Sequence, residues 1–218
     1  MSLLYNGDCL VAMPQLAPES VDCVVTDPPY LVNFHDRSGR SIANDRSDEW
    51  LDPAFAEIYR VLKPDTVCVS FYGWNKVDRF FRAWKAAGFR VCGHIVFTKS
   101  YASKGGMVKY QHESAYVLGK GRPAAPENPI PDVQRFDYSG NRHHPTEKPV
   151  SALRALIGSF TKPGDTVLDP FAGSGSTCVA ARELGRRYIG IEIDETYFAA
   201  AKARLSAPLA GAQLAAAA

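Results

Sequence analysis

Apolar and amphipathic stretches alternate along most of the chain. Short apolar runs bounded by turn residues predict strands over residues 21–26, 66–71, 89–98, 114–118, 166–168 and 188–193. Apolar positions three or four residues apart predict a helix that ends near residue 62 and further helices over 76–88, 150–160, 177–184 and 196–205. This alternation predicts an α/β fold, in which a mostly parallel sheet carries helices on both faces.

Three segments interrupt the pattern. Residues 33–49 are polar and rich in turn formers, which predicts a long loop of the kind that often serves as a lid. A basic connection spans residues 99–111, and residues 123–142 hold five Pro or Gly residues without periodicity. We expect a single domain over residues 1–205, followed by a disordered Ala-rich tail at 206–218.

Composition narrows the class of protein. The chain has 218 residues, of which 46% are hydrophobic and 22% charged, and this suits one soluble α/β domain. No apolar stretch reaches the roughly 18 residues of a membrane span, and the start lacks a signal pattern, so we expect a cytoplasmic protein. Five cysteines without C-x-x-C spacing favour buried thiols over disulfide or zinc roles, and we expect no metal.

The net charge of +2 hides a strong segregation. Residues 1–65 carry 5 Lys or Arg and 11 Asp or Glu, whereas residues 66–122 carry 10 and 2. A basic middle third indicates a face that meets phosphates. The alternative, that these charges only solvate helix faces, stays open.

Two strand ends carry unusual turns. Asp27-Pro28-Pro29-Tyr30 follows the first predicted strand, and the Gly-rich run from Asp169 through Phe171 to Thr177 follows a later one. Ligands of open α/β sheets bind at the carboxyl ends of strands, so we expect both turns to share one cleft. Together the two turns resemble those of S-adenosylmethionine-dependent amino-methyltransferases of nucleic-acid bases. Their order, with Asp-Pro-Pro-Tyr first, resembles the permuted β class of DNA amino-methyltransferases.

The resemblance covers about residues 4–205 and implies a class I methyltransferase (Rossmann-like) sheet in circularly permuted order. It implies seven strands, one of them antiparallel, and S-adenosyl-L-methionine as the cofactor. Gly173 and Gly175 permit close backbone approach, and the helix that follows points free N–H groups toward the cofactor's carboxylate. Glu192 ends the next strand, where an acidic residue accepts hydrogen bonds from ribose hydroxyls. The expected cofactor residues are Asp8, Thr146, Lys148, Asp169, Phe171, Gly173, Ser174, Gly175, Ser176, Thr177 and Glu192.

Three of these residues come from the resemblance alone. Thr146 and Lys148 lie in a segment whose counterpart contacts the methionine end, where Lys148 would neutralise the carboxylate; a plain helix start is the alternative. Asp8 would accept from the adenine amine of the cofactor, with a plain helix cap as the alternative. A dehydrogenase is disfavoured because a third spaced glycine is missing, and the absence of Gly-Lys-Ser/Thr excludes a Walker-type site.

The first turn carries the predicted catalytic residues. An exocyclic amine is a poor nucleophile because its lone pair is delocalised, so a site must accept both of its N–H hydrogens. Asp27 supplies one acceptor and the backbone carbonyl of Pro28 another, which Pro29 holds rigidly. Tyr30 offers a stacking face for an extruded base. A normal aspartate pKa is about 3.9, so Asp27 would orient the amine rather than act as a strong base.

The target base follows from the resemblance. Asp at the first position of the turn indicates adenine N6, whereas Ser is typical of cytosine N4, which stays the alternative. Methylation of cytosine C5 is excluded because the chain has no Pro-Cys pair. RNA or protein-amide methylation and a catalytically silent nucleic-acid-binding subunit are the other readings, but such a subunit would be expected to lose Asp27 or the glycines.

The basic segments predict the DNA surface. We expect DNA contacts from Phe34, Lys99, Lys104, Lys109, Arg122 and Arg142. Phe34 would stack on the base, with a loop or core role equally open. The target-recognition segment spans only about residues 122–143, which predicts a short or relaxed target sequence, or a homodimer that adds contacts. The sequence leaves open whether the enzyme serves restriction-modification with a partner nuclease, phage protection or regulation.

Overall fold

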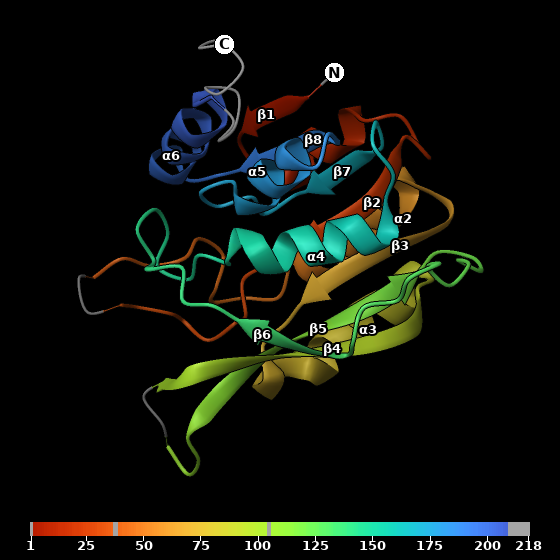
Figure 1. Ribbon diagram of the computed structural model, residues 1–218. Helices are drawn as coiled ribbons and strands as arrows, with labels where there is room; N and C mark the ends of the chain where they lie inside the picture. Colours follow the sequence, from red (N-terminus) through yellow and green to blue (C-terminus); the bar gives the residue numbers. More distant parts are fainter. Residues whose placement is uncertain (1, 37–38, 104–105, 209–218) are drawn as a thin grey trace, which may run out of the picture.

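The computed structural model describes residues 2–36, 39–103 and 106–208, and it is drawn in Figure 1. Within them, eight strands form one sheet in the order β1-β8-β7-β2-β3-β5-β4-β6. The strands are β1 Leu3–Asn6, β2 Val21–Thr26, β3 Leu62–Phe71, β4 Arg90–Ser103, β5 Tyr110–Gly119, β6 Val133–Phe136, β7 Thr166–Asp169 and β8 Arg187–Glu192. Among these, β5 alone runs antiparallel to its neighbours.

Helices cover both faces of the sheet. They are α1 Cys9–Ala12, η1 Met13–Gln15, α2 Leu51–Val61, η2 Trp74–Lys76, α3 Val77–Ala87, α4 Val150–Phe160, α5 Ser176–Glu183 and α6 Glu195–Ser206. In Figure 1, α4, α5 and α6 lie in front of the sheet and α2 and α3 behind it. The predicted α/β fold with a mostly parallel sheet is therefore confirmed.

Strand β2 shows why both faces need helices. Val24 packs into the core beneath α1, α2 and α3, whereas Cys23 and Val25 pack into the core beneath α4 and α5. All three side chains are fully buried. A strand buried on both faces is apolar almost throughout, which explains the short continuous apolar run in the sequence.

The sheet has eight strands rather than the expected seven. The additional strand is β6, which lies parallel to β4 at the edge of the sheet, within the segment 123–142 that the sequence predicts as loop. It has only four residues, of which Phe136 alone is buried. A short edge strand with one buried side chain leaves too weak a pattern to be found in the sequence.

Strands β4 and β5 are also longer than predicted. They continue through much of the connection 99–111 and remain paired, with Ser103 opposite Tyr110. We call residues 99–103 and 106–112 the arm, which projects beyond the sheet in Figure 1. The arm has few apolar positions, so its pairing depends on backbone hydrogen bonds that hydrophobic periodicity does not reveal.

The structure also places the cysteines predicted as buried thiols. Cys9, Cys23, Cys68 and Cys178 are buried thiols as predicted, whereas Cys92 is exposed. The described part of the chain contains no cluster of three metal-ligating side chains. No helix in this part is long and apolar enough to cross a membrane. The expected disorder of the tail concerns mainly residues 209–218, which lie outside the described residues.

Candidate active site

The two unusual turns leave adjacent strands at the same edge of the sheet. Strands β2 and β7 pair in parallel, with Val24 beside Leu168. The hydroxyl of Thr26, at the end of β2, donates a hydrogen bond of 2.9 Å to Oδ1 of Asp169, at the end of β7. The chain continues from β7 toward β8 and from β2 toward β3, in opposite directions along the sheet. This is the switch point at which open α/β sheets bind ligands, and the predicted convergence is confirmed.

The carboxyl ends of β2 and β7 lie toward the left of Figure 1. A cavity opens at this edge of the sheet. The space between its walls, including the open mouth, is about 1220 Å³. It is lined by all the predicted catalytic residues, by Phe34 and by every predicted cofactor residue except Gly175. The two predicted turns therefore line one cavity.

Asp27 is held by two donors inside this cavity. The Tyr30 hydroxyl donates to Oδ1 at 2.8 Å, and the Lys148 ammonium donates to Oδ2. Lys148 also forms an ion pair of 3.2 Å with Glu113, a residue of β5 to which the sequence analysis gave no role. Glu113 in turn pairs with Lys99 at 3.5 Å. The structure thus links Asp27 to β5 through a line of alternating charges.

Lys148 lines the cavity and contacts a carboxylate that the resemblance did not name for it. It directly precedes the Pro149 N-cap of α4, a helix that packs against β2, and this position directs the ammonium onto Asp27. Its Nζ lies 5.4 Å from the centre of the Tyr30 ring and 5.1 Å from that of Phe71. The side chain is only 6% exposed, so its charge is compensated by carboxylates and ring faces rather than by water.

The charges of this cluster sustain one another. Burial raises the pKa of Asp27, and the Lys148 ammonium opposes that shift. Burial alone would lower the pKa of Lys148, but the carboxylates of Asp27 and Glu113 raise it above its ordinary value. Burial would raise the pKa of Glu113, yet Lys148 and Lys99 lower it. Lys148 therefore stays protonated and favours the ionised form of Asp27.

The Gly-rich turn uses its two glycines differently. Gly173 has φ +52° and lines the cavity, and an added Cβ would lie 3.4 Å from the His144 ring. Gly175 has φ +81° and lies behind the cavity wall, where an added Cβ would come within 2.9 Å of Ala201 in α6. Gly173 allows a ligand to approach the backbone, whereas Gly175 allows α6 to pack.

Arg204 of α6 braces the turn from behind. Its guanidinium donates to the backbone oxygen of Ser174 at 2.8 Å and to the Ser176 hydroxyl at 3.1 Å. It also pairs with Glu147 at 3.2 Å, which ties the segment before α4 to the Gly-rich turn. The sequence analysis did not identify Arg204, because nothing in the spacing of α6 distinguishes it from a surface arginine.

Glu192 occupies the expected place at the end of β8. Its Oε2 accepts from the N–H of Gly173 and its Oε1 from the N–H of Asp194, both at 2.7 Å. Burial raises the pKa of Glu192 to about 7 and that of Asp169 to about 6. A carboxylate fixed by two backbone donors keeps further lone pairs for ligand hydroxyls.

Asp8 caps a helix and also lines the cavity. Its Oδ1 accepts from the N–H of Leu10 at 2.8 Å, so the residue caps α1. The same side chain also lines the cavity. Because a carboxylate has four lone-pair sites, capping leaves acceptor capacity for a ligand.

The predicted long loop folds over the cavity. Asp45, which is 2% exposed, accepts from the N–H of Val32 at 3.2 Å and from that of Phe34 at 2.7 Å. Leu31 has φ +62°, a conformation that side chains other than glycine rarely adopt. Asp45 therefore fixes the segment that carries Phe34 beside Tyr30, a role that its place in a polar loop did not reveal.

The predicted DNA-contacting residues separate into groups. Lys109 on the arm and Arg142 in the loop before α4 are exposed near the cavity. Lys99 is placed differently from the prediction, because its side chain is 7% exposed and pairs with Glu113. Lys104 lies outside the described residues.

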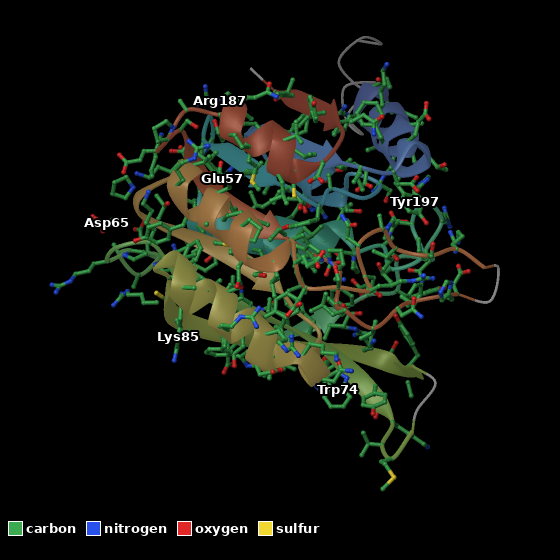
Figure 2. The ribbon with its side chains drawn as sticks, turned by 180° about the vertical axis from the view of Figure 1, so that it is seen from behind. Glu57, Asp65, Trp74, Lys85, Arg187 and Tyr197 are labelled. Carbon is green, nitrogen blue, oxygen red and sulfur yellow. The ribbon has the colours of Figure 1, made fainter. Side chains whose placement is uncertain are left out.

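Arg122 lies at the opposite edge of the sheet from the cavity, which contradicts its predicted position. Because β5 is antiparallel, Ala115 pairs with the carboxyl end of β3, and Gly119 with Val67 near its start. The N–H of Arg122 accordingly donates to Asp65 at 2.6 Å. Figure 2 shows Asp65 on one side of the molecule and Tyr197, which lines the cavity, on the other.

Much of the basic middle third is neutralised in space. On α3, Arg79 pairs with Asp48 at 2.6 Å, and Arg82 lies within 3.4 Å of both Asp48 and Asp52. Lys85 of the same helix points outward into solvent (Figure 2). The charge segregation along the sequence is therefore largely cancelled where the acidic first third packs against α3.

Comparison with known proteins decides the family. A family model described as DNA methylase, of the N6/N4 type, matches residues 21–203, most of the chain. The chain belongs to this DNA methylase family. It is 62% identical over 207 residues to "Putative methylase YubD" of Escherichia coli (strain K12), covering 95% of this chain and 91% of that protein. It is 28% identical over 241 residues to Type II methyltransferase M2.DpnII of Streptococcus pneumoniae, covering 94% and 90%.

Solved structures of DNA methyltransferases share the fold. The M1.HpyAVI–S-adenosylmethionine complex aligns with a TM-score of 0.76 at 25% identity, covering 95% of this DNA methylase and all of that chain. The cytosine-N4-specific PvuII DNA methyltransferase aligns with the same TM-score at 18% identity, covering 94% and 86%. The second likeness concerns the fold alone. The expected homodimer stays a prediction.

Proposed function

We propose that this DNA methylase transfers a methyl group from S-adenosyl-L-methionine to the exocyclic N6 amine of an extruded adenine in DNA. The observation that carries the proposal is the position of Asp27. Its carboxylate is fixed by Tyr30 and Lys148 in the same cavity as the Gly-rich turn. An amine acceptor and a cofactor turn thus face one space.

The residues of the cavity fit S-adenosylmethionine. Glu192 offers a carboxylate for ribose hydroxyls, and the N-terminus of α5 at Ser176 and Thr177 offers backbone donors for the carboxylate. Asp8 keeps acceptor capacity for the adenine amine, and Gly173 leaves room for close approach. S-adenosylmethionine is the cofactor, and when bound it supplies an electrophilic methyl group.

The chain's own residues orient the target amine and take up the proton that it loses. Asp27 Oδ1 and Oδ2 each keep a lone pair beside the donor already bound, so the carboxylate can accept one N–H of the target amine. The carbonyl of Pro28 accepts the other. Asp27 then holds the proton that the nitrogen loses and passes it to water. Lys148 opposes the rise in the pKa of Asp27 that burial causes, and so favours the ionised form that accepts the proton.

Two rings suit the extruded base. Tyr30 and Phe34 both line the cavity, and Asp45 fixes the backbone that carries Phe34. An exocyclic amine inside a duplex is out of reach, so the base must leave the stack and find aromatic faces in the enzyme. The preference for adenine rests on Asp27 as the first residue of the turn, since the cavity would hold either base.

The recognition segment supports a short or relaxed target sequence. Within residues 122–143, Val133–Phe136 form the edge strand β6, so fewer side chains of this short segment are free to read base edges. A homodimer would supply further contacts. A restriction-modification role with a partner nuclease is one setting for such an enzyme.

The test is transfer of tritiated methyl groups from S-adenosylmethionine to DNA, followed by nucleoside analysis and mapping of the modified sites. We expect the label in N6-methyladenine at a short sequence. Label in N4-methylcytosine would overturn the choice of base. Label in RNA or protein but not in DNA would overturn the substrate class, and no label in any of them would favour a catalytically silent subunit.

A further inference from the structure

Two exposed tyrosines meet outside the cavity. Tyr101 on the arm is 39% exposed and Tyr138, in the loop before α4, is 62% exposed. Their ring centroids lie 5.3 Å apart with the planes at 76°. Large aromatic side chains left in solvent are uncommon enough to indicate a binding surface when they form a pair.

The pair is connected to the catalytic carboxylate by contacts. The Lys99 ammonium lies 5.5 Å from the centre of the Tyr101 ring and pairs with Glu113. Glu113 pairs with Lys148, which donates to Asp27. The tyrosines therefore lie at the cavity's edge of the sheet, on a direct line of side chains from the place where the target amine would bind.

The surroundings favour DNA as the occupant. Lys109 of the arm and Arg142, in the same loop as Tyr138, are both exposed and can meet phosphates. A second exposed aromatic contact involves the same arm. Trp74 of η2 is 60% exposed and stacks on Tyr110 of the arm, with ring centroids 5.3 Å apart. Figure 2 shows Trp74 near the base of the arm. Aromatic faces interleaved with cations are typical of surfaces that bind unstacked nucleotides.

We infer that Tyr101 and Tyr138 form a stacking platform for a nucleotide next to the extruded target base. This inference rests on the proposed function, because extrusion of one base leaves its neighbours without a stacking partner. Tyr30 and Phe34 serve the target base inside the cavity, and Tyr101 and Tyr138 serve its neighbour outside. Stacking needs only the π-face of a base, so the platform would hold any base and would add affinity without sequence preference.

The experiment measures DNA binding by Y101A, Y138A, Y101F and Y138F variants. The probe is a fluorescein-labelled oligonucleotide of mixed sequence, both single-stranded and as a duplex, with S-adenosylmethionine binding and melting temperature measured in parallel. Both alanine variants should weaken DNA binding roughly 5- to 100-fold, the range for loss of one stacked base. The phenylalanine variants should stay near the wild type, and all four should bind S-adenosylmethionine normally.

A matched control and the salt dependence sharpen the test. V91A changes another exposed side chain of β4, 45% exposed and far from the arm, and should leave DNA binding unchanged. Loss of stacking should lower affinity equally at all salt concentrations, whereas loss of a phosphate contact would flatten the salt dependence.

Three results would overturn the inference. Unchanged DNA affinity in Y101A and Y138A, with a wild type that methylates DNA, would remove the platform and leave the proposed function intact. A wild type that neither binds nor methylates DNA would refute the proposed function and the platform with it. A dimeric wild type that becomes monomeric in Y138A would assign the tyrosines to a contact between two copies of the chain.

Discussion

At the scale of single residues, the buried charges beside Asp27 are held by ion pairs. Lys148 compensates both Asp27 and Glu113 in a partly buried cluster, and both carboxylates lose a partner if it is removed. Asp27 and Tyr30 were predicted from one four-residue motif. The contact between Lys148 and Asp27 was not predicted, because the sequence neighbours of Lys148 do not reveal whether its ammonium meets Asp27 or the cofactor's carboxylate.

Replacement of Lys148 by Met distinguishes an ammonium that serves Asp27 from one that serves the cofactor's carboxylate. Without the ammonium, only the Tyr30 hydrogen bond opposes the rise in the pKa of Asp27 that burial causes, so the acid limb of kcat/KM should move to higher pH. S-adenosylmethionine affinity should change little. An unmoved acid limb with a large loss of cofactor affinity would instead place Lys148 at the cofactor's carboxylate.

Glu192 should make cofactor binding pH-dependent. Burial raises the pKa of its carboxyl to about 7, so below that pH the proton-bearing form prevails and accepts ribose hydrogen bonds poorly. S-adenosylmethionine affinity should therefore fall as the pH drops from about 8 to about 6, by up to about tenfold per pH unit. E192Q should bind more weakly with a flat profile, measured by calorimetry. Equal slopes in the two proteins would exclude Glu192 as the titrating acceptor.

At the scale of elements, the sequence was informative wherever one face of a strand or helix enters a core. Helix α4 and strand β2 have the predicted bounds, because their apolar positions carry the pattern. The arm and β6 were missed because backbone pairing holds them with little burial. Gly175 was predicted as a cofactor residue. The structure shows in addition that α6 packs where a Cβ at this position would lie.

Gly175 offers a test of that packing. In G175A, the added Cβ would meet Ala201 at 2.9 Å in a backbone conformation with φ +81°. We expect a loss of stability of about 1–3 kcal/mol, seen as a lower melting temperature, together with weaker cofactor binding. G158A in α4 is the matched control, because nothing lies within 4 Å of its added Cβ, and it should be neutral or stabilising. Equal melting temperatures for G175A and the wild type would contradict the packing role.

At the scale of the whole molecule, the sequence predicted which turns meet but not which charges do. The convergence of the Asp27 and Asp169 turns follows from strand direction, which parallel connections fix. The resemblance implied one antiparallel strand, but the sequence did not show that β5 reverses and carries Arg122 to the edge away from the cavity. The basic segment 66–122 was likewise identified from the sequence. The ion pairs of its Arg79 and Arg82 with Asp48 and Asp52 depend on the tertiary fold.

Two cations at opposite edges test the DNA-binding face. K109A removes an exposed charge on the arm, so DNA binding should weaken and the slope of log K against log salt should decrease by about 1. R122A removes a charge at the far edge and should change neither quantity. If R122A weakens binding as much as K109A, DNA does not bind at the cavity edge alone.

The most direct measurement compares wild type and D27A for methyl transfer to DNA and for S-adenosylmethionine binding in the same buffer. In the proposed function Asp27 serves the target amine and the Gly-rich turn serves the cofactor, so D27A should lose transfer by at least about 10²-fold while its cofactor affinity stays within a few-fold of the wild type. The lost activity should be N6-adenine methylation. Transfer that persists in D27A, or cofactor binding that is lost to the same extent as transfer, would contradict a single cavity with separate places for the amine and the methyl donor.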